Sequence, residues 1–177
     1  MGLRIARDKA PEFVLHWSGE KRTGQMSGII KLSHGRSSER SAGSFCDIRA
    51  MVLQSVGPIP HEVSVPFHDS QVRKAALLIQ TGWDQYWDTE EYWKRVPVLA
   101  EHLIFRCVRS GIRVLGVDFP IGDRTTETRL ITTGKIPIVE NLCGLTSLPR
   151  TGFRFTTVPL EASSGDVVPV HAFAEVT

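Results

Sequence analysis

The sequence predicts an α/β fold in which helices support a mixed sheet, and three observations carry this prediction. Compact apolar runs at 75–79 and 112–119 have the length and composition of buried strands. Between them, residues 98–110 place apolar side chains at helical spacing. Later runs at 153–160 and 167–176 alternate as strands do. Strand, helix and strand in succession predict parallel pairing through a right-handed crossover.

Composition indicates a single soluble domain over residues 1–177, with 41% apolar and 23% charged residues and a net charge of +2. The charges are interspersed, which argues against a nucleic-acid partner, and no apolar run approaches the roughly 20 residues of a membrane helix. The charged N-terminus has no apolar core of a secretory signal. Three widely spaced cysteines, Cys46, Cys107 and Cys143, are typical of reduced thiols in the cytoplasm.

The first part of the chain gives weaker patterns than the rest. Short strands are predicted at 12–17 and 26–32, and a loop rich in Ser, Gly and Arg at 33–44. Residues 47–56 have apolar positions at helical spacing, but a strand fits nearly as well, so both remain open. The three prolines of residues 57–70 exclude a regular central strand or helix there.

The clearest predicted helix follows Pro97. Leu99, Leu103 and Cys107 stand four residues apart and form its apolar face, and Gly111 is placed as a C-cap. A second short helix is predicted at 129–134, before a strand at 136–142.

Acidic residues end two of the predicted strands. Asp118 and Glu140 lie at or near the carboxyl ends of their strands, and Asp123 lies in the polar loop between them. Because carboxyl ends of parallel strands meet at one edge, these acids are candidates for the mouth of a pocket. The alternative is structural: Asp118 and Asp123 stabilise a turn, and Glu140 is satisfied by backbone amides or by Arg129.

Aromatic residues are concentrated just after the first buried strand. This cluster has two interpretations, a pocket for a flat substrate or packing in a core or subunit interface. Trp83 directly follows a Thr-Gly turn at a strand end, so it is the strongest candidate to touch a substrate. The cluster consists of Trp83, Tyr86, Trp87, Tyr92 and Trp93.

An ordered set of segments resembles the cyclase family of metal-dependent hydrolases, which includes kynurenine formamidase, isatin hydrolase and trans-dienelactone hydrolase. The segments are ALLIQTGWDQYW, GIRVLGVDFPIGD, GKIPIVENLCGLTSLP, FRFTTVPL and PVHAFAEV. They fall within residues 72–176, whereas residues 1–71 are divergent. The resemblance implies a swivelling β/β/α cyclase-like fold, a homo-oligomer (dimer or tetramer) and hydrolysis of a small-molecule amide, lactam or lactone by a metal-activated water.

The metal motif of that family, HxGTHxDxPxH, is not found in this chain. The segment at the family's position keeps its glycine as Gly24, but Arg22, Met26 and Gly28 stand where two histidines and an aspartate are expected. Glu140 matches a metal-ligand position of that family, so the resemblance implies that it binds zinc or manganese. Its usual histidine partner should fall near residue 127, where the chain has glutamate.

Two functions therefore remain open. The first is an arylformamidase-like hydrolase of an aryl or cyclic amide, lactam or lactone, with zinc or manganese bound by Glu140 and a lesser contribution from His61 and His68. Its substrate pocket would be lined by Trp83, Tyr86, Trp87, Asp118 and Asp123. The second is a non-catalytic, metal-free family member that acts as a binding or oligomeric structural protein. Divergence or an altered reading frame would explain residues 1–71.

Overall fold

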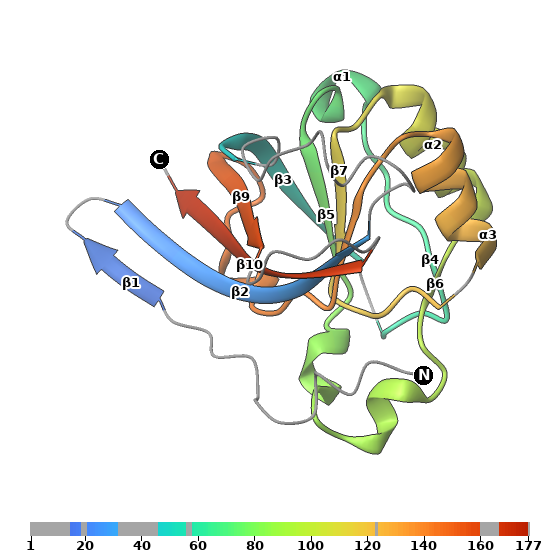
Figure 1. Ribbon diagram of the computed structural model, residues 1–177, viewed down its shortest axis with the longest axis horizontal. Helices are drawn as coiled ribbons and strands as arrows, with labels where there is room; N and C mark the ends of the chain where they lie inside the picture. The colour runs from blue at the N-terminus through green and yellow to red at the C-terminus, as the bar shows by residue number, and fades with distance from the viewer. Residues whose placement is uncertain are drawn as a thin grey trace.

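The computed structural model has one large mixed sheet that curls back on itself (Figure 1). The structure describes residues 15–18, 21–31, 46–55, 58–122, 124–159 and 167–176. The predicted loop at 33–44 and the candidate Asp123 lie outside this part of the chain. The strands of the sheet are β1 Leu15–Ser18, β2 Lys21–Lys31, β3 Ile48–Gln54, β5 Ala76–Gln80, β7 Val114–Val117, β8 Ile138–Glu140, β9 Phe153–Pro159 and β10 Val167–Val176.

The order of the strands closes this sheet into a ring. It runs β1-β2-β10-β9-β3-β5-β7-β8, and β2 also pairs with β8. The neighbours β3, β5, β7 and β8 are parallel, whereas β9, β10 and β2 pair antiparallel. The α/β class with a mixed sheet is confirmed. The strand β2, from the divergent part of the chain, pairs with both β10 and β8 and so closes the ring.

The strand β3 corrects one of the two interpretations of residues 47–56. The helix is wrong there and the strand alternative holds. Ile48, Ala50 and Val52 are buried on one face of β3, and Met51 and Leu53 are buried on the other. A strand covered on both faces is apolar almost throughout, so its sequence also satisfies a helical spacing by coincidence.

Short helices and a small second sheet cover one face of the large sheet (Figure 1). In the main helix, Leu103 and Cys107 are buried as predicted, and Gly111 caps it with φ 68°. Burying each large aliphatic side chain there stabilises the fold by on the order of 2 kcal/mol. Among the described helices, none is long and apolar enough to cross a bilayer. These elements are α1 Asp69–Val72, α2 Glu101–Ser110, α3 Arg124–Glu127, β4 Glu62–Val63 and β6 Val98–Leu99.

Two clusters of buried side chains lie on opposite faces of the parallel strands. The outer cluster joins Leu77, Ile79 and Leu115 to α2, and the inner cluster joins Leu78 and Val114 to β9 and β10. Space inside the ring is tight at one glycine of β7. A Cβ added to Gly116 would lie 2.4 Å from Leu78 Cδ2, so the inner cluster packs directly on the β7 backbone.

Candidate functional site

Asp118 fastens the turn after β5 to the end of β7. Its Oδ2 accepts hydrogen bonds from the backbone N–H groups of Thr81 and Gly82, both at 2.7 Å, and Oδ1 accepts one from the Thr81 hydroxyl at 2.7 Å. The residue is 0% exposed, and burial raises the pKa of its carboxyl to about 6 against the opposing effect of these bonds. Gly82, at φ 81°, makes the tight turn possible. Asp118 therefore acts as a clasp on the Thr-Gly turn.

Glu140 holds the loop after β7 in the same manner. It is buried at the end of β8, and its Oε2 accepts a hydrogen bond from Ile121 N at 2.8 Å. Arg129, the partner expected from the sequence, instead pairs with Glu101 of α2. Each of the two acids thus binds backbone of the loop that follows the preceding strand of the sheet.

A third carboxylate links the loop after β8 to the aromatic segment. Asp84 Oδ2 accepts a hydrogen bond from Gly144 N at 3.0 Å. Nearby, the Tyr92 hydroxyl donates to Asn141 Oδ1 at 2.8 Å, and Asn141 has φ 61°. These contacts tie the segment 83–93 to the carboxyl edge of β8, so the loops after three neighbouring strands are joined into one rim.

The aromatic cluster packs largely against itself and the outer core. Trp83 and Tyr92 are buried, and Trp83 Nε1 donates to the Tyr92 carbonyl at 3.1 Å. Trp83 meets Tyr86, and Trp87 meets Tyr92, edge to face with ring centroids 5.0 Å apart. Burial raises the pKa of Tyr92 above its ordinary range. Trp93 is 52% exposed. Trp83 and Tyr92 pack in the core, as the packing interpretation predicts, and a substrate contact by Trp83, Tyr86 or Trp87 stays a prediction.

Within the residues that the structure describes, Glu140 is not joined by enough donor side chains to form a zinc or manganese centre. In the antiparallel ladder Ile29 of β2 is the register partner of Glu140, so Gly28 and Met26 occupy the adjacent stretch of β2. Neither residue supplies a metal donor, and catalytic zinc sites use about three protein ligands. Across the described ranges, no group of three or more His, Cys, Asp or Glu residues could hold a metal ion.

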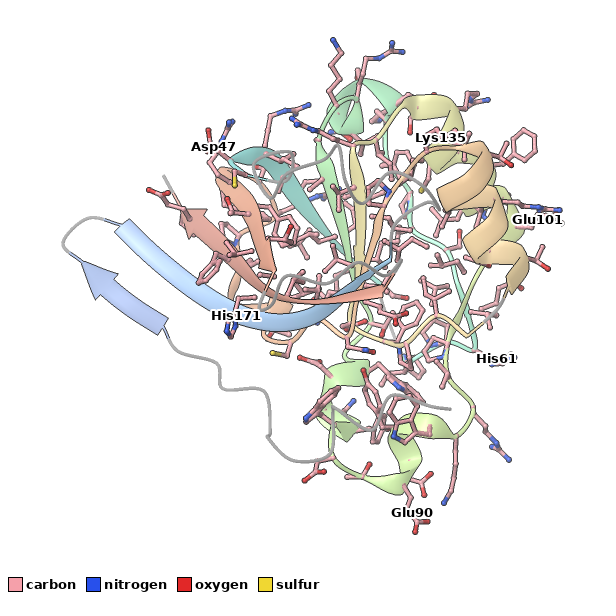
Figure 2. All side chains as sticks on the ribbon, viewed as in Figure 1. Asp47, His61, Glu90, Glu101, Lys135 and His171 are labelled. Carbon is pink, nitrogen blue, oxygen red and sulfur yellow. The ribbon has the colours of Figure 1, made fainter. Side chains whose placement is uncertain are left out.

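The two histidines considered as further ligands lie apart from such a group. His61 precedes β4 and is exposed at the periphery of the molecule (Figure 2). His68 is exposed at the start of α1, where its backbone N–H donates to Gln71 Oε1 at 3.1 Å. The structure does not bring either of them together with Glu140 as a set of three donors.

A hollow of about 370 Å³ opens at the same edge of the sheet, beside the ends of β3 and β5. Gln54 and Gln80 are the last residues of these strands and are register partners. Sequence reasoning missed this site, although a glutamine directly after an apolar run in each strand was a usable signal. The lining residues are Val52, Leu53, Gln54, Val65, Pro66, Gln80, Leu145, Thr146, Leu148 and Arg150.

Solved structures with the same fold include several that are described as hydrolases, and two of them match as follows. One, described as a potential metal-dependent hydrolase with cyclase activity, has a TM-score of 0.66 at 12% identity, covering 85% of this chain and 78% of that one. The other is isatin hydrolase A from Labrenzia aggregata, bound to benzyl benzoate, with a TM-score of 0.65 at 16% identity, covering 94% and 90%. At these identities the likeness establishes the fold, which is cyclase-like.

Sequence comparison points to the same family. The Cyclase family model, described as "Putative cyclase", matches residues 49–124. The Uncharacterized protein MJ0783 of Methanocaldococcus jannaschii is 29% identical over 99 residues, which are 55% of this chain and 52% of that protein. The match thus spans about half the length of this curated relative. The resemblance to the cyclase family is confirmed, and the matched residues include Asp118, Trp83, Gln54 and Gln80 but not Glu140.

Proposed function

We propose that this chain is a non-hydrolytic member of the cyclase fold that binds a small molecule. One observation carries the proposal: Glu140, the family's metal-binding position, holds Ile121 N instead. The strand that pairs with it contains Met26 and Gly28, neither of which has the imidazole or carboxylate that zinc or manganese sites use. A single carboxylate does not hold a catalytic metal.

The arrangement of the rim supports binding rather than turnover. Hydrolysis of an amide or lactam by this family's chemistry requires a metal that supplies an activated water. Asp118, Glu140 and Asp84 instead direct carboxylate oxygens at backbone N–H groups. Such bonds fix the loops around the carboxyl edge of the sheet, and a fixed rim lowers the entropy cost of binding a ligand.

The second candidate function is the family's metal-dependent hydrolysis of an aryl or cyclic amide, lactam or lactone. The position of β2 favours it, because the segment aligned with the family motif pairs directly with the strand of Glu140. In this case the missing donors would come from residues outside the described ranges, or from a second copy of the chain in a homo-oligomer.

Metal analysis and a hydrolysis assay separate the two functions. Purified protein is incubated with zinc or manganese and desalted, and its metal content per chain is measured. Turnover of isatin and of N-formylkynurenine is then followed for wild type and Glu140→Gln. We expect well under one metal ion per chain and no turnover above buffer in either protein. One metal ion per chain, with turnover that Glu140→Gln abolishes, would establish the hydrolase and end the proposal.

A further inference from the structure

We infer that the hollow at the ends of β3 and β5 binds a small organic carboxylate with an apolar body. We call it the Gln54–Gln80 hollow after the two residues that end these strands. It lies beside the Asp118 clasp but uses different side chains. The inference rests on the proposed function, because it takes the ligand to be bound and not hydrolysed. It adds to that function the site and the chemical class of the ligand.

The two glutamines provide the first part of the argument. Register partners on neighbouring parallel strands have side chains on the same face, so Gln54 and Gln80 project side by side into the hollow. Gln80 is 6% exposed as a whole residue, and within the described residues its side-chain amide makes no hydrogen bond. Its amide atoms are not among the fully buried unpartnered atoms of the described protein, so they are open to the hollow. An amide that is open to a hollow and has no partner in the described protein is available to hydrogen-bond a polar ligand there.

Arg150 provides the second part, because this cationic residue also lines the hollow. Its carbonyl accepts a hydrogen bond from Val52 N at 3.0 Å, which fixes this residue against β3. In the described part of the chain its guanidinium forms no ion pair, and the lining residues include no acid. A guanidinium binds a carboxylate through two parallel hydrogen bonds, and the NH₂ groups of Gln54 and Gln80 can donate to the same anion.

The other residues that line the hollow indicate the chemistry of the ligand beyond its carboxylate. It is mostly aliphatic, and the volume of about 370 Å³ lies within the range of sites for small organic molecules. A body about the size of one aromatic ring, joined directly to a carboxylate, matches both parts of the lining. The aliphatic side chains of this wall are Val52, Leu53, Val65, Leu145 and Leu148.

The test uses benzoate as the probe, because it has this chemistry and no bond for a hydrolase to cleave. The full chain labelled with ¹⁵N is titrated with benzoate and, separately, with neutral benzamide. Glutamine side-chain NH₂ signals report directly on Gln54 and Gln80. We expect saturable shifts of these signals and of the Leu53 and Leu145 amides, with benzoate binding at least about tenfold more tightly than benzamide.

Substitution of the exposed Arg150 tests the role of the charge without disturbing the core. Arg150→Gln should weaken benzoate about tenfold or more and leave benzamide nearly unchanged. Arg95→Gln, which removes an equal charge away from the hollow, is the control and should bind benzoate as wild type does. Absence of saturable shifts, shifts located elsewhere, or equal losses in both variants would overturn the inference.

The outcome is independent of the hydrolysis assay. Benzoate binding at the hollow together with metal-dependent turnover of isatin would end the non-hydrolytic proposal but keep this site. Absence of both binding and turnover would remove the site and leave the metal-free interpretation of Glu140 standing.

Discussion

The carboxyl edge of the sheet is built in two contrasting ways along its length. From β5 to β8 its polar side chains are engaged by the protein, as Asp118 binds the Thr81–Gly82 turn and Glu140 binds Ile121 N. At the ends of β3 and β5, Gln54 and Gln80 face a hollow, and their side-chain amides make no hydrogen bonds to the described protein. The polar side chains of the first region stabilise the fold, whereas those of the second region are available to a ligand.

The contrast is sharpest between two adjacent residues. Thr81 donates its hydroxyl to Asp118, whereas Gln80 lines the hollow. Side chains alternate between the two faces of a strand, so one step along the chain separates a structural role from a candidate binding role. Polar residues at a strand end therefore have to be judged by their partners rather than by their position.

Asp118→Ala should produce the largest effect, because it leaves two buried donors of Thr81 and the part-buried N–H of Gly82 without an acceptor. We expect the free energy of unfolding at pH 7 to fall by about 3 kcal/mol or more. Chemical denaturation followed by tryptophan fluorescence would measure this change. Asp69→Ala is the control, since in the described part of the chain Asp69 forms ion pairs with the half-buried Arg106 and the exposed Arg109, and its loss should cost under about 1 kcal/mol. Equal losses of stability in the two variants would contradict the structural role assigned to the hydrogen bonds of Asp118.

The pH dependence of the free energy of unfolding gives a second test of the Asp118 carboxyl. Burial raises the pKa of Asp118 from 3.8 to about 6, so the folded chain binds this proton more tightly than the unfolded chain. The stabilising contribution of this group is therefore complete below pH 3.8 and is lost as the pH rises through 6. The unfolding free energy of wild type minus that of Asp118→Asn should fall by about 2–3 kcal/mol across this window. A difference that grows with pH would contradict the assignment.

The hydroxyl of Tyr92 should make a smaller contribution. Tyr92→Phe removes its bond to Asn141, both partners being buried, and should cost about 1 kcal/mol. Tyr86 lies in the same aromatic cluster and packs on Trp83, but its hydroxyl makes no hydrogen bond to the described residues. Tyr86→Phe should therefore leave the denaturation midpoint unchanged. A loss in Tyr86→Phe as large as that in Tyr92→Phe would contradict the hydrogen-bond explanation.

The sequence predicted the parallel strands, α2 and its Gly111 cap because these depend on local periodicity and on one residue at positive φ. It placed Asp118 and Glu140 correctly at one edge because parallel strands share the direction of their carboxyl ends. It could not show that β2 closes the ring next to Glu140, since that pairing joins residues more than a hundred positions apart. The hydrogen-bond partners of each acid depend on loop conformation, and loops have no periodic sequence pattern. The contacts of Asp118 and Glu140 and the hollow could therefore be found only from the structure.

The smallest expected effect concerns Gln80, and it tests the contrast directly. Because its side-chain amide has no partner among the described residues, Gln80→Leu should change the free energy of unfolding by less than about 0.5 kcal/mol, or slightly stabilise the fold. Thr81→Val, one residue further, removes a buried bond to Asp118 and should cost about 1–3 kcal/mol. Denaturation of the two variants under one condition gives the comparison. If Gln80→Leu proved as costly as Thr81→Val, Gln80 would serve the fold as Thr81 does, and the distinction between the two parts of the edge would disappear.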